Sequence, residues 1–219
     1  MNWEDFFMRG LILYGENCTL DVWNKMKSEL AVHNVTFVEY PYNITEKANN
    51  ISDITKWVYA TYGNERFDFI LGHSMGGIIG LELVADFKLR CDKVIFIESN
   101  LKPAKNFYRN LMLPSNMGQY GKEIISMIKG EARYYSDSLK KALQEEFNYT
   151  DHIRKINSKV YGIYGDRGQK GYVNRISDLC LDDDIVEKID LRFVENSCHM
   201  PMIENHEMLV DIIESILAE

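Results

Sequence analysis

The pentapeptide Gly-His-Ser-Met-Gly at residues 72–76 could place a serine hydroxyl for nucleophilic attack. It matches the pattern G-x-S-x-G, in which glycines two positions before and after the serine allow a sharp turn without side-chain collisions. The apolar run at 67–71 is typical of a buried strand, and the apolar segment at 77–84 is typical of a helix. This context favours a strand-to-helix turn with Ser74 at its tip over a packing turn whose serine only caps a helix.

Ser74 would need a base and a carboxylate, because an unaided hydroxyl is a poor nucleophile at neutral pH. His199 is the best candidate base. It follows the predicted last strand, where a loop returns to the carboxyl edge of the sheet, and catalytic groups of open α/β sheets gather at that edge. The plain alternative is an ordinary loop histidine. The other histidines close a helix, point away from the serine or lie in polar segments: His33, His73, His152 and His206.

Backbone amides beside the turn could hold the negative charge that develops on an attacked carbonyl oxygen. The amide of Met75 would lie at a helix N-terminus and point into the same space as the serine hydroxyl. A second amide would come from the turn after the first strand, Gly15-Glu16-Asn17, where glycine lets the backbone approach closely. Glu16 is one candidate for this second donor, and Asn17 is the other.

The rest of the chain predicts the elements that must position these groups. Apolar runs predict strands at 8–14, 35–40, 67–71, 93–97, 159–164 and 188–194. Spacings of three and four residues predict helices at 20–33, 52–62, 173–181 and 206–217, with Ser52 as the N-cap of the second. Strands that alternate with helices imply an α/β fold built on a mainly parallel, doubly wound sheet of about six strands.

About sixty residues, 100–158, separate the predicted fourth and fifth strands, far more than an ordinary connection. Helical patterns at 106–111, 122–129 and 136–147 predict a helical cap above the strand ends. Its aromatic and methionine side chains either fix the cap to the sheet or line an apolar acyl pocket. They are Phe107, Tyr108, Met112, Met117, Tyr120, Met127, Tyr134 and Tyr135.

Composition narrows the function classes. The chain of 219 residues suits a single domain, with 46% hydrophobic and 26% charged residues. The net charge of −8 argues against nucleic acid and against an anionic membrane surface, and no run approaches the ~20 apolar residues of a membrane span. The acidic N-terminus is unlike a signal peptide, which predicts a cytoplasmic protein. The four cysteines lack C-x-x-C spacing, so no metal site or disulfide framework is expected.

Three segments together resemble the α/β-hydrolase superfamily: the Gly72–Gly77 elbow, the Tyr14-Gly15 turn followed by Trp23, and the HMPMIEN segment that begins at His199. The resemblance covers nearly the whole chain. It implies a hydrolase fold with a small helical cap, most often an esterase or thioesterase. It also implies that the usual N-terminal antiparallel strands are trimmed, since the chain begins close to the first strand.

The resemblance leaves two candidates for the acid. The family carboxylate commonly follows the fifth strand in a Gly-x-x-Asp turn, but here Gly168 stands in that position and the nearby carboxylate is Asp166. Some members, haloalkane dehalogenases among them, carry the acid after the fourth strand, where this chain has Glu98. A carboxylate that ends a buried strand is costly without a partner, and an imidazole N–H would supply one. Otherwise Glu98 is a surface residue and Asp166 a turn former.

Two functions follow from these residues. In the first, a serine hydrolase cleaves a small carboxylic ester or thioester through an acyl-enzyme, with Ser74 as nucleophile, His199 as base and Glu98 or Asp166 as acid. That chemistry requires no cofactor and no metal, and its partner is a small-molecule acyl ester. In the second, the protein keeps the fold as a binding or accessory protein without an effective acid, since aspartate is missing at position 168.

Overall fold

The computed structural model describes residues 7–145 and 147–219. Six strands form one sheet in which every neighbouring pair is parallel, as predicted. The spatial order is β2-β1-β3-β4-β5-β6. The strands are β1 Arg9–Leu13, β2 Asn34–Phe37, β3 Arg66–His73, β4 Arg90–Ile97, β5 Lys159–Gly165 and β6 Ile189–Val194.

The strand order reverses between β1 and β3, because β2 lies outside β1 and the later strands extend the sheet from β3. The turn after β1 and the turn after β3 therefore meet at the carboxyl edge of the sheet. Open α/β sheets bind their ligands at such a switch point. The predicted serine turn and the predicted Gly15-Glu16-Asn17 turn are these two segments.

Helices cover both faces of the sheet, and neighbouring strand residues reach opposite layers. The α4 helix, Met75–Ala85, is buried along its whole length and packs against α3, Ile51–Tyr62, and α7, Thr150–Lys155. Ile70 reaches Gly80 of α4, whereas the ring of Phe69 on the other face lies 5.9 Å from the His33 ring. His33 in turn contacts Glu214 of α10, His206–Leu217. The doubly wound α/β fold predicted from the sequence is confirmed.

Several local predictions were wrong. The predicted helix at 20–33 is instead a 3₁₀ turn, η2 Leu20–Trp23, followed by the short helix α1, Lys27–Leu30. The side-chain amide of Asn24 donates to the carboxylate of Asp21 and closes a local turn that separates η2 from α1. The α3 helix is capped by Asn50, whose side chain accepts from the Asp53 amide, so Ser52 is not its N-cap.

The predicted helix at 173–181 is also wrong. Only η5, Ser177–Leu179, forms there, and Cys180 ends it in a left-handed conformation with φ of 57°. Three further one-turn helices are α2 Tyr42–Thr45, α8 Asp183–Val186 and α9 Pro201–Glu204.

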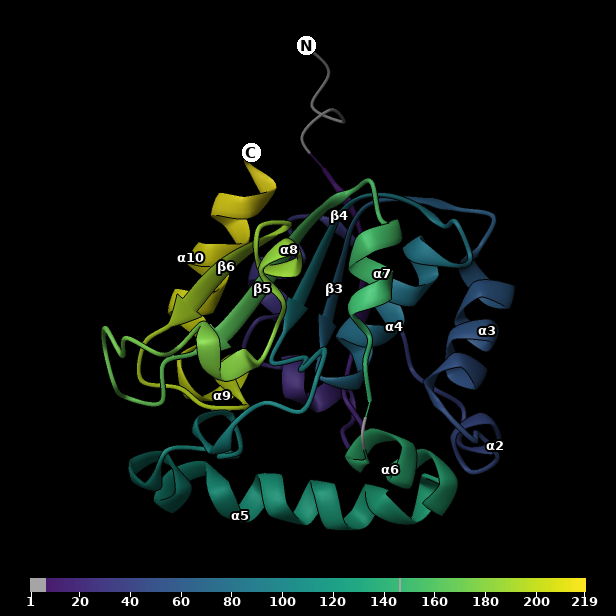
Figure 1. Ribbon diagram of the computed structural model, residues 1–219. Coiled ribbons are helices and arrows are strands. Elements are labelled where there is room, and N and C mark those ends of the chain that lie inside the picture. The colour runs from purple at the N-terminus through teal and green to yellow at the C-terminus, as the bar shows by residue number, and fades with distance from the viewer. Residues whose placement is uncertain (1–6, 146) are drawn as a thin grey trace.

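The segment between β4 and β5 forms a helical layer below the carboxyl ends of the strands (Figure 1). Its long helix, α5 Pro114–Glu131, crosses the bottom of the molecule in that view, and α6, Asp137–Gln144, is drawn just above the right end of α5. The short 3₁₀ turns η3 Asn106–Tyr108 and η4 Ala132–Tyr134 flank α5. The Ser136 side chain caps α6 by accepting from the Leu139 amide. We refer to this layer, from η3 to α6, as the cap.

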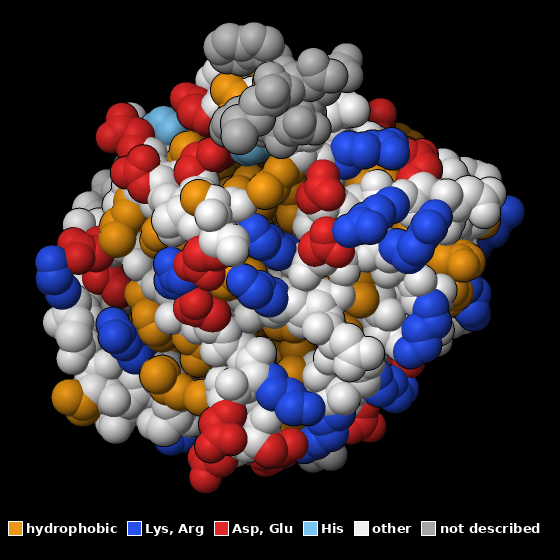
Figure 2. Space-filling model, turned by 90° about the horizontal axis from the view of Figure 1, so that it is seen from above, with side chains coloured by type: hydrophobic (Ala, Val, Ile, Leu, Met, Phe, Trp, Pro, Cys, Tyr) orange, Lys and Arg blue, Asp and Glu red, His pale blue; other side chains and the backbone are white. Residues whose placement is uncertain are grey.

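The opposite end of the molecule carries acidic and basic side chains interspersed with apolar ones (Figure 2). Ion pairs across neighbouring strands, such as Arg66 with Asp92 at 2.7 Å, contribute to this mixture. Exposed pairs of this kind add little to stability, because water screens the two charges. Among the helices of the described residues, none is both long and apolar enough to cross a membrane.

Candidate active site

Ser74 occupies a sharp turn between β3 and α4. Its φ of 52° and ψ of −119° lie outside the regions that ordinary residues prefer, and its amide donates to the Ile97 carbonyl at 2.8 Å. Two glycines permit the turn. A Cβ at Gly72 would lie 2.4 Å from the Gly76 carbonyl carbon, and a Cβ at Gly76 would lie 2.6 Å from the Leu13 carbonyl oxygen. The serine is therefore held in a strained conformation at the carboxyl edge of the sheet.

His199 lies in the loop after β6, and two elements fix its backbone. Its amide donates to the Leu111 carbonyl at 3.1 Å, and its carbonyl oxygen accepts from Nε2 of His73 at 2.9 Å. Burial lowers the pKa of His73 to about 3, so this imidazole is neutral and donates through Nε2. His73 therefore positions the loop that carries His199. No sequence signal distinguished this role, because it depends on two segments far apart in the chain.

Glu98 is the candidate acid that the structure places beside His199. It directly follows β4 with φ of 51°, and its side chain is 1% exposed. Its Oε2 lies 3.5 Å from Nδ1 of His199, and its Oε1 accepts from the Gly165 amide at 2.6 Å. Arg167 contributes two further bonds. Burial alone would raise the pKa of Glu98, but the charge and hydrogen bonds of Arg167 outweigh burial and lower it.

Asp166 is engaged elsewhere. Its Oδ1 accepts from the backbone amides of Gly168 and Asn196, both at 2.7 Å. These bonds close the turn after β5 and attach it to the loop after β6. These contacts are those of a turn former, the plainer of the two sequence interpretations. Within the described chain, the imidazole of His199 has its carboxylate contact with Glu98.

Ser74 and His199 open into one cavity of about 160 Å³ at the carboxyl edge of the sheet. Its sheet side comes from the two turns, α4 and the end of β4, and its cap side comes from α6 and the segment that follows. The lining residues are Glu16, Ser74, Met75, Ile78, Glu98, Asn100, Leu143, Gln144, Phe147, Tyr149 and His199. Five residues that the sequence singles out therefore line one small volume: Glu16, Ser74, Met75, Glu98 and His199.

The cap aromatics and methionines that the sequence singled out do not line this cavity, among the residues that the structure describes. Tyr120 and Met127 instead line a separate cavity of about 230 Å³ between α5 and η2. Tyr108 and Tyr135 are buried in the core. Most of this set fixes the cap to the sheet, and the apolar cap wall of the serine cavity comes from Leu143 and Phe147.

The turn after β1 approaches the serine closely. A Cβ at Gly15 would lie 3.0 Å from the Cβ of Ser74 and from Nδ1 of His73, so a larger residue would press against both side chains. Glu16 and Met75, the predicted oxyanion donors, both line the cavity. Burial raises the pKa of the Glu16 carboxyl group, against the opposing charge of Lys140. Its Oε1 is buried and has no hydrogen-bond partner among the described residues.

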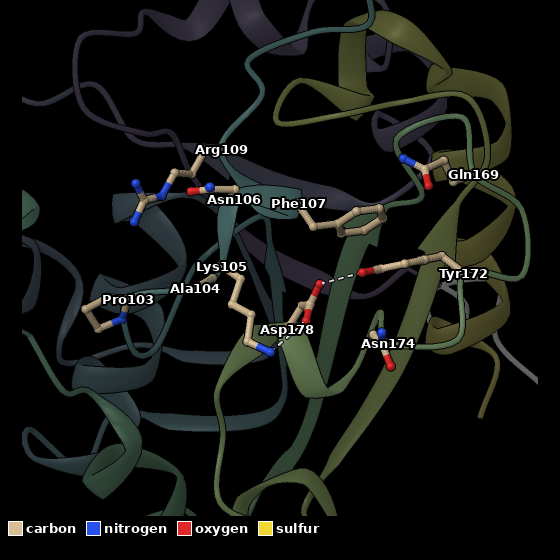
Figure 3. A pocket seen from close by; sticks show the side chains of 10 residues that line it. All are labelled: Pro103, Ala104, Lys105, Asn106, Phe107, Arg109, Gln169, Tyr172, Asn174 and Asp178. Carbon is tan, nitrogen blue, oxygen red and sulfur yellow. Dashed lines mark hydrogen bonds and ion pairs between the residues drawn. The ribbon is translucent and has the colours of Figure 1, made fainter.

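A larger and more open groove, of about 820 Å³, lies between η3 and the segment after β5 (Figure 3). Its most buried charged group, Asp178, is paired with Lys105 at 3.1 Å and accepts from the Tyr172 hydroxyl at 3.0 Å. Neither Ser74 nor His199 lines this groove. The chemistry-bearing residues therefore belong to the smaller cavity.

The sheet topology, the strained serine turn and the cap define an α/β protein with a hydrolase-like arrangement of its strands. A family model described as alpha/beta hydrolase fold matches residues 39–122, which include β3 and the serine turn. The chain has the α/β-hydrolase fold that the sequence predicts. No curated protein sequence matches the chain.

Solved structures share this fold at low sequence identity. Est816, described as an N-acyl homoserine lactone degrading enzyme, is 12% identical with a TM-score of 0.72, over 95% of this chain and 92% of that one. The enol-lactonase from Burkholderia xenovorans LB400 is 14% identical with a TM-score of 0.71, over 100% and 94%. A thermophilic esterase from Thermogutta terrifontis is 12% identical with a TM-score of 0.70, over 96% and 89%. These likenesses concern the fold.

Proposed function

We propose that the protein is a serine hydrolase that cleaves a small carboxylic ester or thioester through an acyl-enzyme intermediate. One observation carries the proposal: Ser74, in its strained turn, shares a small cavity with His199, and the buried Glu98 lies behind the imidazole. A nucleophile, a base and an orienting carboxylate in this relation are what acyl transfer requires. The esterase and lactonase names of the structural neighbours agree with this class of reaction.

The proposed reaction has two half-steps. The hydroxyl of Ser74 attacks the carbonyl carbon while Nε2 of His199 takes its proton, and Glu98 stabilises the imidazolium that forms at Nδ1. The amides of Met75 and of the turn at Glu16 hold the oxyanion. The imidazolium returns its proton to the leaving alcohol or thiol, and a water molecule then attacks the acyl-serine by the same path in reverse.

The cavity favours a small substrate. Its volume of about 160 Å³ is below the roughly 300–1,000 Å³ typical of ligand pockets. Met75, Ile78, Leu143 and Phe147 give it apolar walls that suit a short acyl chain. We therefore expect turnover to be highest with acetyl to butanoyl esters and to fall with longer chains.

A p-nitrophenyl ester panel of increasing acyl length tests this proposal. We expect hydrolysis by the wild type that is lost in Ser74→Ala, with both proteins equally folded by circular dichroism. A binding or accessory protein is the alternative, and the 3.5 Å separation of Glu98 and His199 favours it because that contact is longer than an ordinary hydrogen bond. Folded wild type that hydrolyses no ester in the panel would support this alternative.

A further inference from the structure

Arg167 makes a buried ion pair with the candidate acid. Its guanidinium is 1% exposed, and its Nη1 and Nη2 donate to Oε1 and Oε2 of Glu98, each at 2.6 Å. This paired geometry matches the planar fork of the guanidinium to both carboxylate oxygens. Oε1 accepts from both Arg167 and the Gly165 amide, so Glu98 meets His199 with Oε2, at 3.5 Å from Nδ1.

The guanidinium is held from every side, so it cannot swing away from Glu98. Nε donates to the Phe107 carbonyl at 3.1 Å, and Nη1 also donates to the Gly165 carbonyl at 2.7 Å. Its plane lies against the Tyr108 ring, 4.6 Å from the ring centroid. Arg167 itself has φ of 55°, and its backbone amide is bonded to Ser197. A buried charge is retained only when satisfied as completely as this.

Arg167 is also the cation that keeps Glu98 charged. The other titratable groups facing this carboxylate, apart from His199, are neutral at neutral pH. Burial lowers the pKa of His73 to about 3, raises the pKa of Cys198 to about 12 and raises the pKa of Tyr108 and Tyr164. Without the guanidinium, the carboxylate would keep one backbone donor, the Gly165 amide, and its contact with His199.

We propose that Arg167 is a positioning residue that holds Glu98 as an oriented anion behind His199 and thereby sets the lower pH limit at which the Ser74–His199 pair works. This inference rests on the proposed hydrolase function. The carboxylate and the imidazole interact, so they take up a proton as one coupled unit. The adjacent positive charge opposes that uptake. Removing the charge of Arg167 lets the Glu98–His199 pair hold a proton to higher pH. While that pair is protonated, it cannot accept the proton of the Ser74 hydroxyl.

The test compares Arg167→Met with Arg167→Lys in the full chain. With p-nitrophenyl acetate, we expect Arg167→Met to lower kcat/KM at pH 7 by about 10²-fold and to move the acid limb of its pH profile to higher pH. Arg167→Lys keeps the charge without the fork, and we expect it to keep the wild-type acid limb. An acid limb that stays in place in a folded Arg167→Met, or that moves equally in both variants, would overturn the proposal.

A double-mutant cycle separates action through Glu98 from a purely structural effect. In the Glu98→Gln background, we expect Arg167→Met to cost less than threefold in kcat/KM, because the carboxylate on which the arginine acts is already gone. An undiminished loss in that background would contradict the inference. The double variant removes both charges together, so it folds even where the single Arg167→Met leaves an unpaired buried carboxylate.

A measurement without turnover keeps this inference separate from the proposed function. In the Ser74→Ala protein, the ring signals of His199 report by NMR the pH midpoint at which the Glu98–His199 pair takes up its proton. We expect the further change Arg167→Met to raise that midpoint, whether or not the wild type hydrolyses esters. An unchanged midpoint would overturn the role of Arg167, whereas an inactive wild type would overturn only the hydrolase proposal.

Discussion

Replacing each of the two candidate acids by its amide distinguishes their roles. Both carboxylate oxygens of Glu98 accept hydrogen bonds from Arg167, and Glu98→Gln replaces one of them by an NH₂ group. The new NH₂ group then faces an N–H of the guanidinium, and the buried guanidinium loses its counter-charge. Leaving one partner of a buried ion pair costs about 3–5 kcal/mol. In a chain of this size, Tm falls by about 2–4 °C per kcal/mol, which predicts a decrease of roughly 6–20 °C.

The same substitution should abolish most turnover. An amide behind the imidazole does not stabilise the imidazolium, and in serine hydrolases this change lowers kcat by about 10⁴-fold. Asp166→Asn is the matched control. Its Oδ1 can still accept from the two amides of Gly168 and Asn196, so we expect a loss of at most about 1 kcal/mol and a change in kcat/KM of less than fivefold.

The assay is hydrolysis of p-nitrophenyl acetate at a temperature well below the Tm of the weakest variant, with circular dichroism to show that each protein is folded. The reasoning predicts a large loss in Glu98→Gln and a small one in Asp166→Asn. The reverse order in folded proteins would refute the assignment of Glu98 and return Asp166 as the acid. Equal, small losses would show that neither carboxylate supports the imidazole.

We make three further predictions. Gly76→Ala would press a Cβ against the Leu13 carbonyl, so we expect little folded protein. Gly118→Ala is the control: the space around Gly118 is open, and the change should raise Tm slightly, so soluble yield and melting curves distinguish the two variants. Burial raises the pKa of Glu16, so its side chain is charged, and repels the oxyanion, only above that pKa. Glu16→Gln should therefore raise kcat/KM several-fold at high pH and leave it unchanged at low pH. Arg167 lowers the pKa of Glu98 in the folded protein despite burial. The charged carboxylate therefore stabilises the fold above about pH 4, and this stabilisation is lost as the pH falls through the lowered folded-state pKa. Calorimetry should show that Tm falls more steeply with decreasing pH in the wild type than in Glu98→Gln.

The sequence was most informative where a local pattern and its physical cause lie in the same segment. The buried strands and the elbow were predictable because apolar runs and paired glycines act within a few residues. The α10 helix was predictable to the residue because its apolar stripe is unbroken. The helices predicted at 20–33 and 173–181 failed because local side-chain hydrogen bonds and a left-handed residue compete with helical periodicity.

The candidate site was only partly predictable, since its members come from separate strands. The pattern of residues 72–76 identified Ser74, and position after the last strand identified His199. The pairing of Glu98 with Arg167, 69 residues apart, has no signature in composition or spacing. The neutral His73 that holds the His199 loop has no local signature either, since strand alternation predicts only that its side chain points away from Ser74. The apolar cap wall, Leu143 and Phe147, also lies outside the aromatic and methionine residues that the sequence singles out, because packing decides which side chains face the cavity.

The central claim is that the hydroxyl of Ser74 is the nucleophile, and covalent labelling tests it most directly. A fluorophosphonate probe reacts with an activated serine, and peptide mass spectrometry locates the adduct. We predict stoichiometric labelling of the wild type at Ser74, no labelling of Ser74→Ala and strongly reduced labelling of His199→Ala. A folded wild type that stays unlabelled, or that carries the adduct at another residue, would contradict the claim.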